Sequence, residues 1–98
     1  MADVLRLMAE ADDDERYEDA EIVCDGACYI GLRRISRQTV DRLLKLVAIS
    51  RSDMSGEVYV INDTGRSLLR RPELATEIMQ AFVTGGAFTI IDDRLVRM

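Results

Sequence analysis

The sequence lacks the features on which several common classes of protein depend. It contains no histidine, the side chain most often used as a general base, and no G-x-S-x-G, P-loop or G-x-G-x-x-G motif. These absences favour a protein that is not an enzyme and needs no cofactor. No apolar run approaches the roughly 18 to 20 residues that cross a bilayer, and the first residues lack the pattern of a signal peptide. We therefore expect a cytoplasmic protein with no membrane partner.

Cysteine is also scarce, since Cys24 and Cys28 are the only two. Structural zinc needs four ligands, so two cysteines without any histidine cannot complete a zinc site within one chain. A four-cysteine site shared by two chains and a redox pair are the alternatives, although the spacing is not C-x-x-C. The simplest interpretation is that both are small apolar strand residues. In a reducing cytoplasm we expect both thiols to be free of disulfide and metal.

The chain does contain enough apolar and charged sequence for one small globular domain. Its 98 residues are 48% hydrophobic and 32% charged, a balance that excludes a disordered chain. A chain of this length supports one modest core. We expect an acidic helix or arm over residues 1–20 and a single α+β domain over residues 21–98.

Charge is distributed unevenly along the chain, although the net charge is only −5. Residues 1–25 hold ten acidic and two basic groups, whereas residues 31–51 hold six basic groups against Asp41 alone. The acidic run from Asp12 to Glu15 lacks the spacing of a calcium-binding loop. We interpret this run as a solvated acidic face, with docking onto the basic segment as the alternative.

Hydrophobic periodicity and turn signals predict the order of the elements. Helices are expected over residues 3–11, 36–48 and 63–71 and from residue 74 to the Gly85-Gly86 pair, a strand over 57–61, a loop over 51–56, and hairpins over 21–31 and 87–98. The last helix is expected to bury Leu74, Ala75, Ile78, Met79 and Phe82.

The two hairpins are predicted from their turn residues. Asp25-Gly26 is a type I′ turn signal, which would place Cys24 opposite Ala27 and Val23 opposite Cys28. The second hairpin is expected to turn at Asp92-Asp93.

The predicted helix over 36–48 combines a basic surface with a buried stripe. Ser36 can cap its N-terminus, and Val40, Leu43, Leu44 and Val47 have the spacing of one buried face. A capped helix with basic and amide side chains in its first turns suits contact with phosphates and base edges. The candidate DNA-contacting residues are Arg33, Arg34, Ser36, Arg37, Gln38, Thr39, Arg42, Lys45 and Arg51. An ordinary amphipathic helix with a solvated basic face is the alternative.

The segment Y-V-I-N-D-T-G-R-S-L-L at residues 59–69 resembles a pattern found in MarR-like and PadR-like winged-helix proteins. In that family it marks the last wing strand entering the next helix, with Asn62 as the cap and Gly65 permitting close backbone approach. The recognition helix, wing loop and wing strand precede it in the same order as residues 36–61 here. The resemblance covers residues 36–71.

This resemblance implies a winged-helix-like α+β fold and a small bacterial-type transcriptional regulator. Such a protein would bind duplex DNA through helix 36–48, as a homodimer. The alternative implied by the same scaffold is a non-enzymatic module for protein–protein interaction, whose arginines would meet an acidic protein surface.

Overall fold

The computed structural model describes residues 2–52 and 56–98, and among them five strands form one antiparallel sheet in the order β3–β2–β1–β5–β4. These strands are β1 (Glu21–Asp25), β2 (Ala27–Ile30), β3 (Arg33–Ile35), β4 (Ile49–Arg51) and β5 (Glu57–Ile61). The remaining elements are α1 (Ala2–Asp13), the 3-10 helix η1 (Tyr17–Ala20), α2 (Arg37–Lys45), α3 (Asp63–Arg70), α4 (Leu74–Thr84), β6 (Phe88–Ile91) and β7 (Arg94–Arg97). The expected α+β class is confirmed.

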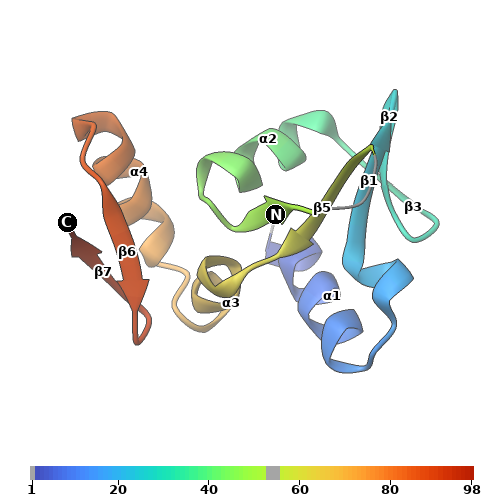
Figure 1. Ribbon diagram of the computed structural model, residues 1–98, viewed down its shortest axis with the longest axis horizontal. Helices are drawn as coiled ribbons and strands as arrows, with labels where there is room; N and C mark the ends of the chain where they lie inside the picture. Colours follow the sequence, from blue (N-terminus) through green and yellow to red (C-terminus); the bar gives the residue numbers. More distant parts are fainter. Residues whose placement is uncertain (1, 53–55) are drawn as a thin grey trace.

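The five-stranded sheet has one buried face and one open face. Ile22, Ile30 and Tyr59 are buried on the face that α1, α2 and α3 cover, whereas on the other face Val23 and Tyr29 are exposed and Val58 is buried. Figure 1 shows α2 and α1 on the same side of the sheet but at opposite ends of it. The helix α4 and the β6–β7 hairpin extend from this body on the far side of α3 (Figure 1).

The acidic N-terminal helix is part of the core. Leu5 and Met8 of α1 are buried in the same cluster as Ile22 and Leu43. At the end of α1, Arg66 of α3 forms ion pairs with two aspartates, Asp12 and Asp13. The acidic run is therefore tied to α3, and these two carboxylates do not dock onto the basic helix α2. No helix of the described residues is long and apolar enough to cross a membrane.

The first hairpin differs from its prediction by one residue in register. Cys24 lies directly opposite Cys28, and Asp25 lies opposite Ala27. A type I′ turn needs positive φ at both central residues, but here only Gly26, with φ of 76°, has it. The shift brings the two sulfurs together as a Cys24–Cys28 disulfide, with 4.1 Å between the two Cα atoms. The expectation of free thiols is therefore wrong.

Two short strands were not predicted from the sequence. The strand β3 follows β2 after two residues and continues the sheet at its edge, and β4 lies between the end of the predicted helix 36–48 and the expected loop, of which it takes only Arg51. Part of that loop, residues 53–55, lies outside the described residues. The prediction of strand 57–61 and of a cap at Asn62 is confirmed.

Helix α2 ends three residues earlier than predicted, and Val47 lies on the surface instead of in the core. Val47 has φ of 57°, the left-handed conformation that ends a helix. Its N–H donates to the Leu44 carbonyl and the Ala48 N–H to the Leu43 carbonyl, at 3.0 and 2.9 Å. These two bonds form a Schellman motif, in which glycine is the usual left-handed residue. Because the helix ends at this left-handed residue, Leu46 is buried in the core, where Val47 was expected to lie.

The junction between β5 and α3 holds this end of α2 in place. The Asn62 side chain accepts a hydrogen bond from the Gly65 N–H and donates to the Val47 carbonyl and the Ser50 hydroxyl, at 2.8 to 2.9 Å. A Cβ atom at Gly65 would lie 2.3 Å from the Ala48 carbonyl oxygen. The predicted role of Gly65 in a close backbone approach is confirmed.

The C-terminal elements follow the prediction in order but not in which side chains they bury. In α4, Leu74, Ile78 and Ala81 are buried, whereas Met79 and Phe82 are exposed, contrary to expectation. The stripe actually buried has i, i+4, i+7 spacing, and Met79 and Phe82 lie beside it rather than on it. Gly85 ends the helix in a left-handed conformation, as expected.

The β6–β7 hairpin turns at Asp92-Asp93, where both residues have positive φ. Asp93 accepts hydrogen bonds from Arg70 and from the Ser67 hydroxyl of α3, the latter at 2.7 Å. The Arg70 hydrogen bonds, followed by that from Ser67, lower the pKa of Asp93 from 3.8 to about 2. This turn is the polar anchor of the C-terminal hairpin on the body.

Candidate nucleic-acid interface

The basic helix α2 is built by a local cap and a narrow buried face. The Ser36 side chain accepts the Thr39 N–H at 3.1 Å, so the predicted cap is confirmed. Val40 and Leu43 are fully buried and Leu44 is half-buried, which fixes the rotation of the helix about its axis. Thr39 is half-buried and its hydroxyl lies 2.9 Å from that of Ser36, so both hydroxyls belong to the cap.

The outward face of α2 carries three polar side chains that are free to bind a ligand. Gln38, Arg42 and Lys45 are exposed, and none of them forms a side-chain hydrogen bond or ion pair within residues 2–52 and 56–98. Gln38 and Arg42 are one turn apart, so they point in similar directions. These side chains can donate hydrogen bonds to phosphates and to base edges.

Arg37, by contrast, is already engaged. It pairs with Asp41 one turn along α2 at 3.3 Å and with Glu57 at the start of β5. The hydrogen bond to Glu57, before any other cause, raises the pKa of Arg37 above its usual value. Half of its side chain remains exposed, but its charge is offset by two carboxylates. Arg37 is thus best placed to fix α2 against β5.

The two arginines of β3 are separated by the alternation of the strand. Arg34 lies opposite Tyr29 and lines a shallow cavity of about 480 Å³ with Ser36 and Arg37. Arg33 instead lines a hollow beside α1 and η1 that also contains Asp19. Arg34 thus borders the start of α2 from the outer face of the sheet, which it shares with Tyr29, and Arg33 lies beside α1 instead.

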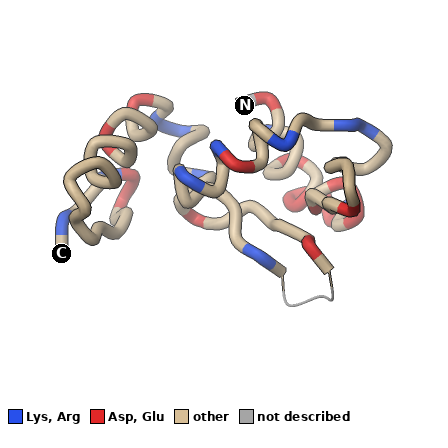
Figure 2. The backbone as a smooth tube through the Cα atoms, turned by 90° about the horizontal axis from the view of Figure 1, so that it is seen from above, with Lys and Arg blue, Asp and Glu red and all other residues tan. Residues whose placement is uncertain are grey.

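The last predicted contact residue, Arg51, ends β4 and donates a hydrogen bond to the Gly56 carbonyl at 3.3 Å. It lies at the base of the β4–β5 connection. Seen from above in Figure 2, blue segments follow α2 and the chain just before it, and much of the red gathers where α1 ends and η1 begins. In this view the segment that carries the basic residues of α2 thus lies apart from the acidic end of α1, although Arg33 lines a hollow with Asp19.

The sequence interpretation did not identify two neighbours of α2. Glu57 was assigned only to a strand, although its pairing with Arg37 changes what Arg37 can do. Met79 of α4 lines an open groove of about 440 Å³ together with Gln38, Asp41, Arg42 and Lys45 of α2. Glu57 is 20 residues away from Arg37 in the sequence, and Met79 is 34 residues away from Lys45. Neither neighbour can therefore be recognised from a local sequence pattern.

The described residues contain no group of three or more histidine, cysteine, aspartate or glutamate side chains that could hold a metal ion. Comparison with protein-family models, with curated proteins and with solved structures gives no significant match.

Proposed function

We propose that this protein is a small, non-enzymatic transcriptional regulator that binds duplex DNA through α2. The observation that carries the proposal is the outward face of this capped helix, where Gln38, Arg42 and Lys45 are exposed and unpaired among the described residues. A helix of this kind fits the major groove, where glutamine can pair with adenine and arginine with guanine.

The arrangement around α2 supports a winged-helix interpretation. After α2 the chain forms the antiparallel pair β4–β5, and β5 also pairs with β1, which follows α1. This is the order of helix, wing strands and sheet that the resemblance of residues 36–71 implies. A standard winged helix has a further helix just before the recognition helix, and here β3 occupies that place. The proposed domain is therefore a variant with a longer sheet.

The cations available to phosphates are Arg34, Arg42, Lys45 and Arg51, because Arg37 is offset by carboxylates and Arg33 lies beside α1. Each neutralised phosphate contributes about −0.9 to the slope of log affinity against log salt. Three to four contacts predict a slope of about −2.7 to −3.6.

The test is a titration of labelled mixed-sequence duplex DNA at several salt concentrations. Lys45→Ala should weaken binding to all duplexes alike and flatten the salt slope by about one. Arg94→Ala is the matched control, since this exposed arginine lies on β7 and forms no ion pair among the described residues. Gln38→Ala should instead change sequence preference, by about 1–3 kcal/mol at one base pair. Absence of binding at micromolar protein in about 50 mM salt would refute the proposal.

A further inference from the structure

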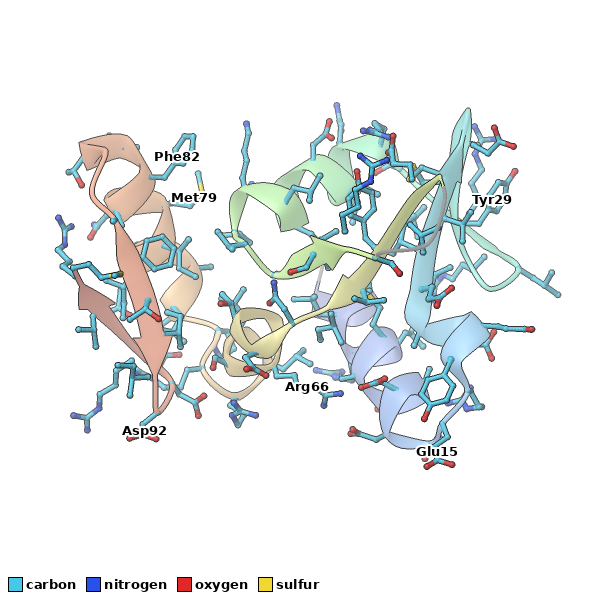
Figure 3. All side chains as sticks on the ribbon, viewed as in Figure 1. Glu15, Tyr29, Arg66, Met79, Phe82 and Asp92 are labelled. Carbon is cyan, nitrogen blue, oxygen red and sulfur yellow. A yellow bond between two sulfur atoms is a disulfide. The ribbon has the colours of Figure 1, made fainter. Side chains whose placement is uncertain are left out.

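The groove between α2 and α4 has two walls of opposite chemistry. On one side lie the polar side chains of α2 already described, and on the other lies Met79 of α4. Figure 3 shows Met79 and Phe82 side by side on α4, both directed toward α2. The groove adjoins the proposed DNA-binding face, but its α4 side offers Met79, an apolar side chain that cannot form hydrogen bonds or ion pairs with phosphates.

Met79, the α4 residue that lines the groove, belongs to an exposed apolar stripe that continues along α4 beyond the groove. Met79, Phe82 and Val83 have i, i+3, i+4 spacing, and their exposed fractions are 39%, 60% and 80%. Three large apolar side chains on neighbouring turns form one continuous strip. Such a strip, bordered by charged residues, is the usual sign of a surface that binds a partner.

The polar wall has a net positive charge that nothing in the described chain neutralises. Arg42 and Lys45 have no ion pair within residues 2–52 and 56–98, while Asp41 is paired with Arg37. A ligand that fills the groove must therefore present carboxylates toward α2 and apolar groups toward α4. A ligand without a run of apolar groups, such as a purely acidic loop, would leave Met79 and Phe82 uncovered.

We propose that the α2–α4 groove binds an acidic amphipathic helix of another protein. Such a helix presents leucine-type side chains at i, i+3, i+4 and i+7 and glutamates on the adjoining face, and this is how helices are recognised in grooves between helices. The bound helix uses Arg42 and Lys45, so it competes with DNA for α2. A partner protein would in this way release the regulator from DNA.

The test uses a labelled synthetic peptide of about 18 residues, a length at which a helix is stable enough in water. It carries leucines at i, i+3, i+4 and i+7 and glutamates on the adjoining face. It should bind the intact protein in the micromolar range, and unlabelled duplex DNA should displace it. Peptides with glutamine for glutamate, or with serine for leucine, should each bind at least about tenfold more weakly.

Protein variants separate the two walls. Met79→Ser/Phe82→Ser and Arg42→Gln/Lys45→Gln should each weaken the peptide by about tenfold or more. All four side chains are exposed, so both variants should fold. Val96→Ser, which removes an exposed apolar side chain from β7, is the matched control and should bind normally. If the serine variant of α4 binds the peptide as well as the unchanged protein does, the groove is not the site and the proposal fails.

The partner could also be a second copy of this chain, and sedimentation of the protein alone distinguishes that case. A dimer abolished by Met79→Ser/Phe82→Ser would show that a second copy covers the stripe and would overturn the proposal. A monomer that binds the peptide supports it. Competition with DNA rests on the proposed function, but the two proposals fail separately: peptide binding needs the α4 stripe and DNA binding does not, so a peptide that binds without being displaced by DNA would refute only the competition.

Discussion

Helices α2 and α4 end with the same backbone geometry but differ in the residue that forms it. In α4 the Gly85 N–H donates to the Phe82 carbonyl and the Gly86 N–H to the Ala81 carbonyl, at 3.1 Å each, as the corresponding residues do in α2. The left-handed residue is glycine in α4 and Val47 in α2. A β-branched residue is strained in that conformation, so the surroundings of α2 must enforce its ending. Those surroundings are Asn62 and Gly65.

The two helices also differ in what they expose. The outward face of α2 is polar and basic, whereas that of α4 is apolar. Because the end of α2 is held by Asn62 and Gly65, whereas nothing lies within 4 Å of a Cβ atom at Gly85 of α4, the comparison predicts different responses to equivalent substitutions. It also predicts that each face binds a different kind of ligand.

The largest expected effect is that of Gly65→Ala. A Cβ atom there would lie 2.3 Å from the Ala48 carbonyl oxygen, which is backbone and cannot move aside without shifting the end of α2. We expect a loss of about 3 kcal/mol in the free energy of unfolding, measured in urea. Gly85→Ala is the matched control in α4, where nothing lies within 4 Å, and should cost only about 1 kcal/mol. Equal losses would contradict the proposed role of Gly65.

The hairpins of the two regions are secured differently, and this leads to the second prediction. The β1–β2 hairpin is closed by the Cys24–Cys28 disulfide, with a sequence separation of 4 residues. Closing so short a loop stabilises the fold by about 2 kcal/mol in the chain-entropy treatment. Reductant should therefore lower the free energy of unfolding by about 2 kcal/mol, whereas a Cys24→Ala/Cys28→Ala variant should not respond. A count of two free thiols in the oxidised protein would contradict the disulfide.

These hairpins also show what could be predicted from the sequence and what could not. Both turns were located correctly, because glycine and aspartate favour the left-handed conformation. The register at Asp25-Gly26 was wrong, since pairing with β3 and β5 on either side, and not the turn alone, determines it. The β5–α3 junction was predicted well because its cap and its glycine act over a few residues.

The exposed stripe of α4 was missed for a related reason. Periodicity indicates which residues can share a face but not how wide the covering surface is. Leu74 and Ile78 are buried in the core cluster against which Phe88 of β6 and Leu95 of β7 pack, whereas Met79 and Phe82 remain exposed. The pairing of Arg37 with Glu57 likewise depends on the return of β5 beside α2, which no local pattern encodes.

The third prediction is that Val47→Gly stabilises the protein. Glycine adopts the left-handed conformation without the steric cost that valine bears, and the Val47 side chain is exposed, so little packing is lost. We expect a gain of about 1 kcal/mol by urea unfolding. The reverse comparison is Gly85→Val in α4, which should lose a similar amount. A loss of stability in Val47→Gly would mean that this valine is held by contacts that its exposure does not suggest.

The smallest expected effect concerns the anchor of the C-terminal hairpin. Asp93 has its pKa lowered from 3.8 to about 2 by its hydrogen bonds with Arg70 and then Ser67, so its ionised form stabilises the fold. That contribution is present above pH 3.8 and is lost as the pH falls through about 2. The difference in unfolding free energy between the unchanged protein and Asp93→Asn should therefore be constant near neutral pH and shrink below pH 3.8. A difference that stays constant from neutral pH down to about pH 2 would contradict this role of Asp93.

In the proposed function, α2 binds DNA and α4 does not. The most direct measurement compares the affinity of Arg42→Gln/Lys45→Gln and of Met79→Ser/Phe82→Ser for the same mixed-sequence duplex in about 50 mM salt. The α2 variant should lose about tenfold or more in affinity, because two phosphate contacts disappear, while the α4 variant should bind within about twofold of the unchanged protein. Equal affinities for all three proteins, or a loss confined to the α4 variant, would contradict the proposed function.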